Sequence, residues 1–477
     1  MTFLSDHDIE KGVAVNPAEL RVIANSSPNH DGSSNSNNQN HDVERNDSSG
    51  KKSSCCSINL KGIWSIEARG ITRVENAEKK SPRPLHDYFH MFSLWFSINL
   101  GAVNIIIGLL GPLVYGLGWV DCICIIIFGG GLASCSVSYL ATFGPESGLR
   151  SMILGRYFMG YWPSKIAALC NIVQQVGFGT IGCIVTGQMI TAVNGGGLSL
   201  AVGCVIAALF GYIPQALAIF VLIDSAGKNF NIDAVSVGDP ASINANRCSF
   251  FALIFASIIG FSAVRVGIAT GVPNVPEWSE AYEISSGALL YACFSGLGGF
   301  GGFCVVIISL GSITNNAPCS YSAALTIQTL GEYPKRVPRW LWCVVITAIE
   351  LVLSVAGRDR LFTVFQNFLP MMAYWICPWI TIVLEEHLLF HKLLGRPFDW
   401  SINENRKKLP VGIAATLSFL IGFSGAFVGM YQVWYTGPLA LKIGGEYGGD
   451  IGEWIAIGFT GVVFPPLRWL ELKRLGR

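Results

Sequence analysis

The chain from Gly287 to Ile313 reads GALLYACFSGLGGFGGFCVVIISLGSI and continues as TNNAPCSYS to Ser322. An uncharged apolar run of this length is typical of a helix that crosses a bilayer. The carboxamides of Asn315 and Asn316, followed by Pro318, predict that the helix is interrupted at its end. Polar groups at membrane depth are tolerated only where they face protein or a water-filled cavity. The stretch therefore predicts a lined binding cavity inside an all-α polytopic membrane protein.

The composition of the whole chain agrees with a membrane protein. Of its 477 residues, 51% are hydrophobic and only 13% are charged, whereas soluble domains carry about 25% charged residues. Residues 1–57 differ from the rest, because they are rich in Asn, Ser, Asp and His and cannot bury enough apolar surface to fold. The net charge of +1 argues against nucleic acid as a partner.

The apolar runs divide the chain into four parts. We expect a disordered cytoplasmic tail over 1–57, a cytoplasmic segment over 58–90, a transmembrane domain over 91–467 and a short cytoplasmic tail over 468–477. Lys and Arg gather on alternate loops, which predicts that both termini lie in the cytoplasm. The predicted membrane segments are 91–117, 121–143, 164–192, 198–223, 249–272, 285–313, 340–356, 361–384, 410–433 and 450–467.

Polar side chains recur on one face of the third segment. Asn171, Gln174, Gln175 and Phe178 are spaced at i, i+3, i+4 and i+7, so they share a helix face. Amides in such a stripe either bond a neighbouring helix or line a cavity. The accompanying aromatic ring favours a cavity for a flat ligand, because stacking needs such a ring.

The first segment carries Ser97 and Asn99 shortly before Gly101, then Gly111-Pro112. This pattern suits either close helix packing or a broken helix of the kind that exposes backbone groups to a transported substrate. The glycines from Gly296 to Gly301 match G-x-G-x-x-G, but no strand precedes them, so we interpret them as packing residues inside a helix.

Carboxyl groups within the apolar segments are candidates for proton coupling. Glu350 lies in the middle of 340–356, where a charge is costly unless it is functional or paired. It is therefore the proton-coupling candidate, and a neutral structural carboxyl is the alternative. Glu385 and Glu386 lie at the end of 361–384, where we expect hydration at the cytoplasmic edge to make them less costly.

Two histidine pairs raise one enzyme hypothesis. His86 and His90, and likewise His387 and His391, are spaced as H-x-x-x-H, and imidazoles at i and i+4 can bind one metal. A membrane di-iron oxidase needs more histidines than these four, so we expect neither an enzyme nor a metal site. No other cofactor is expected.

Widely separated motifs together resemble the fungal purine-cytosine permeases of the nucleobase:cation symporter-1 (NCS1) family. They cover nearly all of 60–477 and comprise Ile66-Glu67-Ala68-Arg69-Gly70-Ile71, Leu110-Gly111-Pro112, Gly116-Leu117-Gly118, Phe143-Gly144-Pro145-Glu146-Ser147-Gly148-Leu149-Arg150, Asn194-Gly195-Gly196-Gly197, Asn315-Asn316-Ala317-Pro318-Cys319-Ser320-Tyr321-Ser322, Gly357-Arg358-Asp359, Asn367-Phe368, Lys408-Leu409-Pro410-Val411-Gly412 and Pro465-Pro466-Leu467-Arg468-Trp469-Leu470-Glu471.

The resemblance implies an inverted-repeat (LeuT-like) transporter of twelve helices, with an unwound first and sixth helix around a midplane site. It implies plasma-membrane import of cytosine, adenine, guanine or hypoxanthine, driven by the proton gradient, with relatives that carry vitamin B6. Asn315, Asn316 and Pro318 would hold the base, facing Gln174, Gln175 and Phe178 on the third helix.

The sequence departs from the family pattern in having ten segments. Residues 198–223 resemble the start of the fourth helix joined to the end of the fifth near Tyr212, and 249–272 resembles the sixth joined to the seventh near Arg265. The sixth-helix residues that face the substrate in the family are absent. The alternative to a working permease is therefore a shortened, non-transporting isoform or sensor.

Overall fold

The computed structural model describes residues 101–225, 275–443 and 449–477, together with Ile71, Arg73, Phe92 and Val272. The chain divides into two compact units, Met1–Ile58 and Asn59–Arg477, and every described residue belongs to the second. The described part of this unit is helical apart from one short hairpin, β1 (Tyr431–Gln432) paired antiparallel with β2 (Tyr435–Thr436). The predicted tail 1–57 lies outside the described residues.

Helices make up most of the described residues. In chain order, the helices of four or more residues are α3 (Ala102–Leu109), η3 (Leu110–Val114), α4 (Trp119–Cys124), η4 (Ile125–Gly130), α5 (Gly131–Ala141), α6 (Phe143–Ser147), α7 (Ser151–Met159), α8 (Ser164–Val193), α9 (Leu200–Ser225), α13 (Pro276–Ile284), α14 (Ser286–Cys293), α15 (Gly299–Thr329), α16 (Glu332–Arg336), α17 (Arg339–Gly357), α18 (Leu361–Glu385), η7 (Glu386–Leu393), α19 (Ile413–Gly429) and α20 (Gly452–Leu475). Three single 3-10 turns complete the order: η6 (Ser295–Leu297), η8 (Trp400–Ile402) and η9 (Ala440–Lys442).

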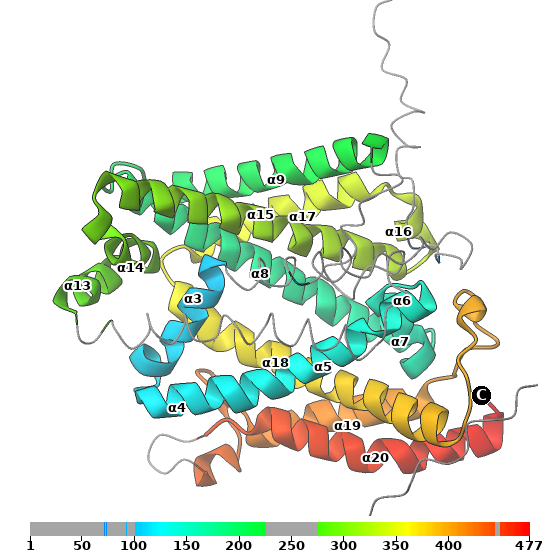
Figure 1. Ribbon diagram of the computed structural model, residues 1–477. Helices are drawn as coiled ribbons and strands as arrows, with labels where there is room; N and C mark the ends of the chain where they lie inside the picture. The colour runs from blue at the N-terminus through cyan, green and yellow to red at the C-terminus, as the bar shows by residue number, and fades with distance from the viewer. Residues whose placement is uncertain are drawn as a thin grey trace, which may run out of the picture. The chain divides into compact units, whose positions relative to one another are not determined.

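Four long helices, α8, α9, α15 and α17, pack against one another and form one side of the unit (Figure 1). Small residues allow these helices to approach closely. The Cα of Gly187 on α8 lies so near the backbone of Gly203 and Cys204 on α9 that a Cβ there would be crowded. Close approach through small residues is the usual means of helix association in membranes.

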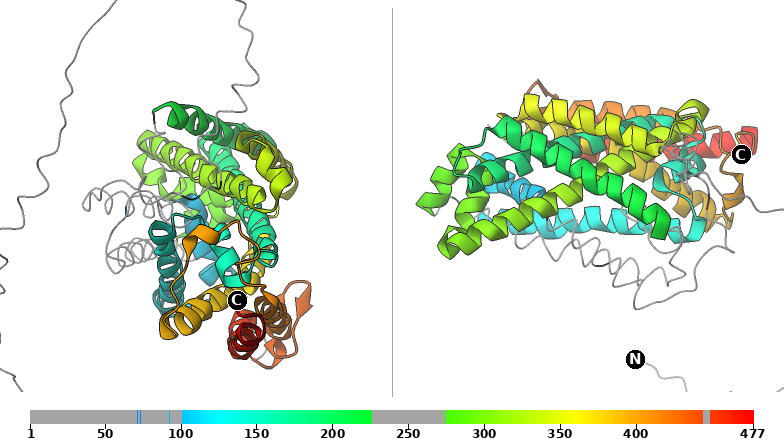
Figure 2. Two further views of the ribbon diagram at one scale, coloured as in Figure 1. Left: turned by 90° about the vertical axis from the view of Figure 1, so that its right-hand side faces the viewer. Right: turned by 90° about the horizontal axis from the view of Figure 1, so that it is seen from above.

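Helices α18, α19 and α20 form a second group, seen at the lower edge of the left view in Figure 2. A buried ion pair joins α20 to η7, which continues directly from α18: Arg468 of α20 donates to both carboxylate oxygens of Glu386, the first residue of η7, at 2.8 and 2.7 Å. Glu386 is fully buried, so the expectation that hydration makes it less costly is wrong. A guanidinium held in bidentate contact compensates the charge instead.

Two apolar cores stabilise opposite ends of the unit. One joins α7 to the carboxyl-terminal half of α18 and to α19, with Tyr157, Trp379 and Phe419 among its members. The other joins α3 to the last turns of α8 and the first turns of α18, and includes Ile106 and Phe365. Helix α18 contributes to both cores and so connects the two ends.

Within the described part of the chain, six helical runs are long and apolar enough to cross a membrane: Trp119–Ala141, Ser164–Val193, Gly299–Thr329, Arg339–Gly357, Leu361–Leu393 and Gly452–Leu475. The runs Ala102–Leu113, Leu200–Tyr212 and Ile413–Gly429 are shorter. These nine runs overlap nine of the ten predicted segments, although Gly299–Thr329 begins and ends well after the predicted bounds of 285–313. The remaining one, 249–272, and the loop that precedes it lie outside the described residues except for Val272.

The predicted helix end near Ile313 is wrong. Helix α15 continues from Gly299 to Thr329 with Pro318 in its interior, and the break lies earlier, between α14 and α15, where Gly298 has φ of +57°. The glycines around Gly298 therefore form a turn and are not all packing residues within one helix. Packing of α15 along α8 and α17 offsets the destabilisation that a proline causes in a helix interior.

Candidate functional site

The polar face of α8 lies between α15 and α18, which both pack against it. One end of this face bonds the neighbouring helix: the Nδ2 atom of Asn171 donates to Thr326 Oγ1 on α15 at 3.0 Å. Asn171 therefore holds α8 and α15 together. Of the two roles that the sequence allowed, bonding a neighbouring helix or lining a cavity, Asn171 has the first.

At the other end of the face, aromatic rings from two helices meet. The rings of Phe178 on α8 and Phe368 on α18 lie 5.4 Å apart between centroids, at 83° to each other. Phe368 also lies directly over Gly177, where a Cβ would overlap its ring. The glycine thus allows Phe368 to approach α8, and the edge-to-face pair is a favoured aromatic arrangement.

Two amide oxygens near this aromatic pair lack partners. Gln174 Oε1 lies one turn from Phe178 on α8, and Asn367 Oδ1 belongs to the residue beside Phe368 on α18. Both atoms are buried, and neither accepts a hydrogen bond from any described residue. A buried acceptor without a donor is costly, so both oxygens are suited to accept N–H groups from a ligand. Gln175 is half-buried on the same helix.

Asn316 lies in the interface between α15 and α8. Its Nδ2 atom donates to the carbonyl oxygen of Gly179 at 2.9 Å and contacts Cys183 Sγ at 3.3 Å. A Cβ on Gly182 would be 2.6 Å from Asn316 Oδ1, so that position requires a glycine. The neighbouring Asn315 and Pro318 are half-buried. Asn316 thus joins α15 to α8, the helix that carries the polar face.

Glu350 is deeply buried where α17, α15 and α8 meet. Only 1% of the residue is exposed, and Ser320 Oγ lies 3.0 and 2.9 Å from its two carboxyl oxygens. A Cβ on Gly179 would overlap the carboxyl group, so this glycine makes room for it. Among the described residues, no cation lies within ion-pair distance of Glu350. Gly179 therefore touches both Asn316 and Glu350 and links the two candidate groups.

The remaining predicted residues are placed as follows. Ser97 and Asn99 lie outside the described residues, and the chain is extended at Gly101 immediately before α3 begins. His86 and His90 also lie outside them. His387 contacts Tyr139, with Nδ1 2.6 Å from the hydroxyl oxygen, and His391 Nδ1 lies 2.7 Å from the carbonyl oxygen of Arg396.

Sequence reasoning did not select Ser320, Gly179, Asn367 or Phe368 as site residues. Ser320 lies four residues after Asn316 and therefore shares its helix face, which is a usable signal. Gly179 follows Gln175 at the same spacing. Phe368 had no comparable signal, because its role depends on a helix far along the chain.

The fold and the buried polar face together define a multi-pass membrane permease, and comparison with known proteins gives the family. A family model described as permease for cytosine/purines, uracil, thiamine, allantoin matches residues 85–258. The purine-cytosine permease fcyB of Emericella nidulans is 30% identical over 470 residues, covering 86% of this chain and 90% of that protein. The chain belongs to this family of nucleobase:cation symporters.

Two further relatives extend the comparison. The vitamin B6 transporter TPN1 of Saccharomyces cerevisiae is 29% identical, covering 86% of this chain and 88% of that protein. The solved structure of MHP1, a nucleobase-cation-symport-1 family transporter with bromovinylhydantoin bound, has a TM-score of 0.57 and 14% identity, and the match covers 85% of this chain and 96% of that one. This structural likeness confirms the inverted-repeat transporter fold.

Proposed function

We propose that this chain is a secondary permease for a small flat nitrogen heterocycle, with a nucleobase such as cytosine, adenine, guanine or hypoxanthine as the first candidate. The observation that carries the proposal is the unpartnered, buried amide oxygen of Gln174, one turn from the Phe178–Phe368 pair. A ring N–H would supply the missing donor, and the ring face would contact the aromatic side chains.

The same chemistry would give specificity. A site that hydrogen-bonds a substrate N–H rejects analogues that lack it, because its own buried polar atoms would remain unpaired. The second acceptor, Asn367 Oδ1, would allow a ligand to be held from α18 as well as from α8. Asn316 supports the site indirectly, since it fixes α15 against α8 at Gly179.

Glu350 is the proposed proton carrier for substrate import. A charged carboxylate at this depth is costly without a cation beside it, whereas the protonated acid can share one hydrogen bond with Ser320. Loss and gain of this proton would couple transport to the proton gradient, with no other cofactor. We place both termini in the cytoplasm, because Lys and Arg gather on the loops of that side. We place the protein in the plasma membrane because import across that membrane is what the family resemblance implies.

A second candidate substrate is vitamin B6. The observation that favours it is the similarity to TPN1. TPN1 is 29% identical to this chain and fcyB is 30% identical, and each alignment covers 86% of this chain. A pyridine ring with hydroxyl groups would also contact an aromatic pair and donate to an amide oxygen.

A third candidate is a protein that does not transport. Helix α9 passes without a break through Gly211 and Pro214, where the family pattern contains the end of one helix and the start of another. The alignment with TPN1 extends over 515 positions, more than the 477 residues of this chain, so it includes positions at which this chain has no residue.

Uptake by permease-null yeast distinguishes the three candidates. Cells expressing these 477 residues would be given labelled cytosine, adenine or pyridoxine at external pH 5 and pH 7. Saturable uptake of a nucleobase that is faster at pH 5 supports the first proposal, and uptake of pyridoxine alone supports the second. If the protein reaches the cell surface and takes up none of them, the transport proposals fail.

A further inference from the structure

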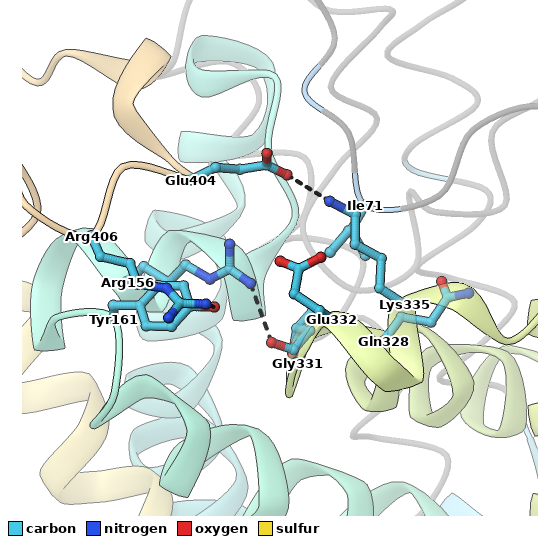
Figure 3. A pocket seen from close by; sticks show the side chains of 10 residues that line it. Ile71, Arg156, Tyr161, Gln328, Gly331, Glu332, Lys335, Glu404 and Arg406 are labelled. Carbon is cyan, nitrogen blue, oxygen red and sulfur yellow. Dashed lines mark hydrogen bonds and ion pairs between the residues drawn. The ribbon is translucent and has the colours of Figure 1, made fainter.

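A separate polar pocket lies where α15 ends and α7 connects to α8 (Figure 3). This α7–α15 pocket has a volume of about 100 Å³, and its principal side chains are Arg156, Tyr161, Glu332, Lys335, Glu404 and Arg406. Figure 3 shows Arg156, Arg406 and Tyr161 on one side of it and Glu332 and Lys335 on the other. None of these residues belongs to the face of α8 described above.

Three cations surround the ring of Tyr161. Arg156 Cζ, Lys165 Nζ and Arg406 Cζ lie 5.1, 5.0 and 4.4 Å from the ring centroid, so no two of them can be more than about 10 Å apart. Arg406 also donates to the Tyr161 hydroxyl at 3.1 Å. None of the three forms an ion pair with a carboxylate of the described residues.

Arg156 is the buried member of this group, with 6% of its surface exposed. Its guanidinium donates to the carbonyl oxygens of Thr329 at 3.2 Å and Asn403 at 3.3 Å, both of which are uncharged. Burial lowers the pKa of Arg156, but a guanidinium stays protonated at neutral pH. The pocket therefore contains a buried positive charge whose hydrogen bonds to these described residues go to uncharged carbonyl oxygens.

The two carboxylates of the pocket do not balance the cations. Glu404 is already bonded to Lys335 at 2.8 Å, and this bond lowers the pKa of Glu404. Among the described residues that line the pocket, Glu332 is the one remaining carboxylate to offset Arg156, Lys165 and Arg406, so positive charge is in excess there. Phosphate groups are suited to such a cluster, because guanidinium groups bind them in charge-assisted hydrogen bonds.

The location of the pocket indicates which kind of molecule would supply a phosphate group to it. Ser164 begins and Thr329 ends a run long enough to cross a membrane, so the pocket lies at the level of the lipid headgroups. Trp162 is 62% exposed there and carries Lys165 over its ring at 4.2 Å, and both residue types favour the membrane interface. We propose that the α7–α15 pocket binds the phosphate of an anionic phospholipid headgroup.

Titration of the purified full-length protein in neutral detergent tests this proposal. The probes are dioctanoyl phosphatidylinositol 4-phosphate, inorganic phosphate and, as a zwitterionic control without net charge, dioctanoyl phosphatidylcholine. The readout is the thermal unfolding midpoint. Saturable stabilisation by the phosphoinositide but not by phosphatidylcholine is expected. Stabilisation by inorganic phosphate without any by the phosphoinositide, or no saturable effect from either, would overturn it.

Three substitutions locate the binding. Arg406→Gln, on an exposed loop residue, should weaken phosphoinositide binding about tenfold, because it removes one charge-assisted contact. Lys407→Gln removes the same charge from the next residue, which does not line the pocket, and should leave binding within about twofold. Glu404→Gln releases Lys335 and should tighten binding. Equal losses in Arg406→Gln and Lys407→Gln, or weaker binding in Glu404→Gln, would place the lipid elsewhere.

Discussion

Ser320 on α15 places its hydroxyl oxygen 3.0 and 2.9 Å from the two carboxyl oxygens of Glu350 on α17. This contact joins two of the four mutually packed helices at a point where Gly179 of α8 leaves room for the carboxyl group. Ser320 is the one hydrogen-bond partner of the Glu350 carboxyl group in the described part of the chain, and this together with its deep burial makes Glu350 the most sharply testable residue of the proposed mechanism.

Replacing Glu350 with Gln should uncouple transport from the proton gradient. The amide has nearly the same shape and its oxygen still accepts from Ser320, so the protein should fold, but it cannot carry a proton. Uptake driven by an inward pH gradient should fall about tenfold or more, while exchange of labelled for unlabelled substrate without a gradient continues. Undiminished accumulation in response to the gradient would exclude Glu350 as the carrier.

Substituting Gly179 with Ala should destabilise the protein by about 1–3 kcal/mol, because the added methyl group overlaps the Glu350 carboxyl group. Gly311→Ala on α15 is the matched control: nothing lies within 4 Å of its added Cβ, and alanine favours a helix. The thermal unfolding midpoint in detergent is the measurement. Equal midpoints for the two variants would show that the contact at Gly179 relaxes without cost.

Gln174 and Phe178 should determine substrate affinity. Gln174→Ala removes the unpartnered amide oxygen and should raise KM about 3- to 10-fold, the value of one hydrogen bond; Phe178→Ala should have a similar or larger effect. Val173→Ala changes an adjacent residue that is 61% exposed and should leave KM unchanged. An unaltered KM in Gln174→Ala would move the substrate away from this face.

Breaking the Glu386–Arg468 pair should be strongly destabilising. Glu386→Gln leaves a buried guanidinium without its full counter-charge, which costs about 3–5 kcal/mol. Glu404→Gln, which breaks the exposed pair with Lys335, should cost less than about 1 kcal/mol. The double variant Glu386→Gln/Arg468→Gln should recover part of the lost stability, measured as the thermal unfolding midpoint. A double variant no more stable than Glu386→Gln would argue that the unpaired charge of Arg468 is not the cause of the destabilisation.

Hydropathy predicted the positions of most of the long apolar helices because a helix that crosses a bilayer must be long and apolar whatever surrounds it. The ends of the helices were predicted less well, because a proline in the sequence does not reliably mark the end of a membrane helix. Pro318, Pro370 and Pro378 all lie inside long helices, since neighbouring helices compensate for the lost backbone bond. The true break, at Gly298, depends on a positive φ that composition alone does not reveal.

Within the candidate site, the spacing of Gln174 and Phe178 predicted a shared face because helical periodicity is a local property. The partners of each polar group are not local. Asn316 bonds Gly179, which is 137 residues earlier, and Glu386 bonds Arg468, which is 82 residues later. Such pairs depend on how the helices cross in the folded protein. The sequence shows each residue of a pair but does not show which residue is its partner.

The length of the unbroken helix α15 also determines how deep its residues lie in the bilayer. Its 31 residues make a rod of about 46 Å, against a hydrocarbon thickness of about 30 Å. A tilt of the usual ~20° removes only about 3 Å of this excess, so part of the helix must project beyond the lipid chains. The projecting end is the one that carries Gln328 and Thr329, since the other end exposes Phe300 and Phe303. Hydrophobic mismatch would thus hold the α7–α15 pocket above the acyl chains, while Asn316 stays inside the hydrocarbon layer.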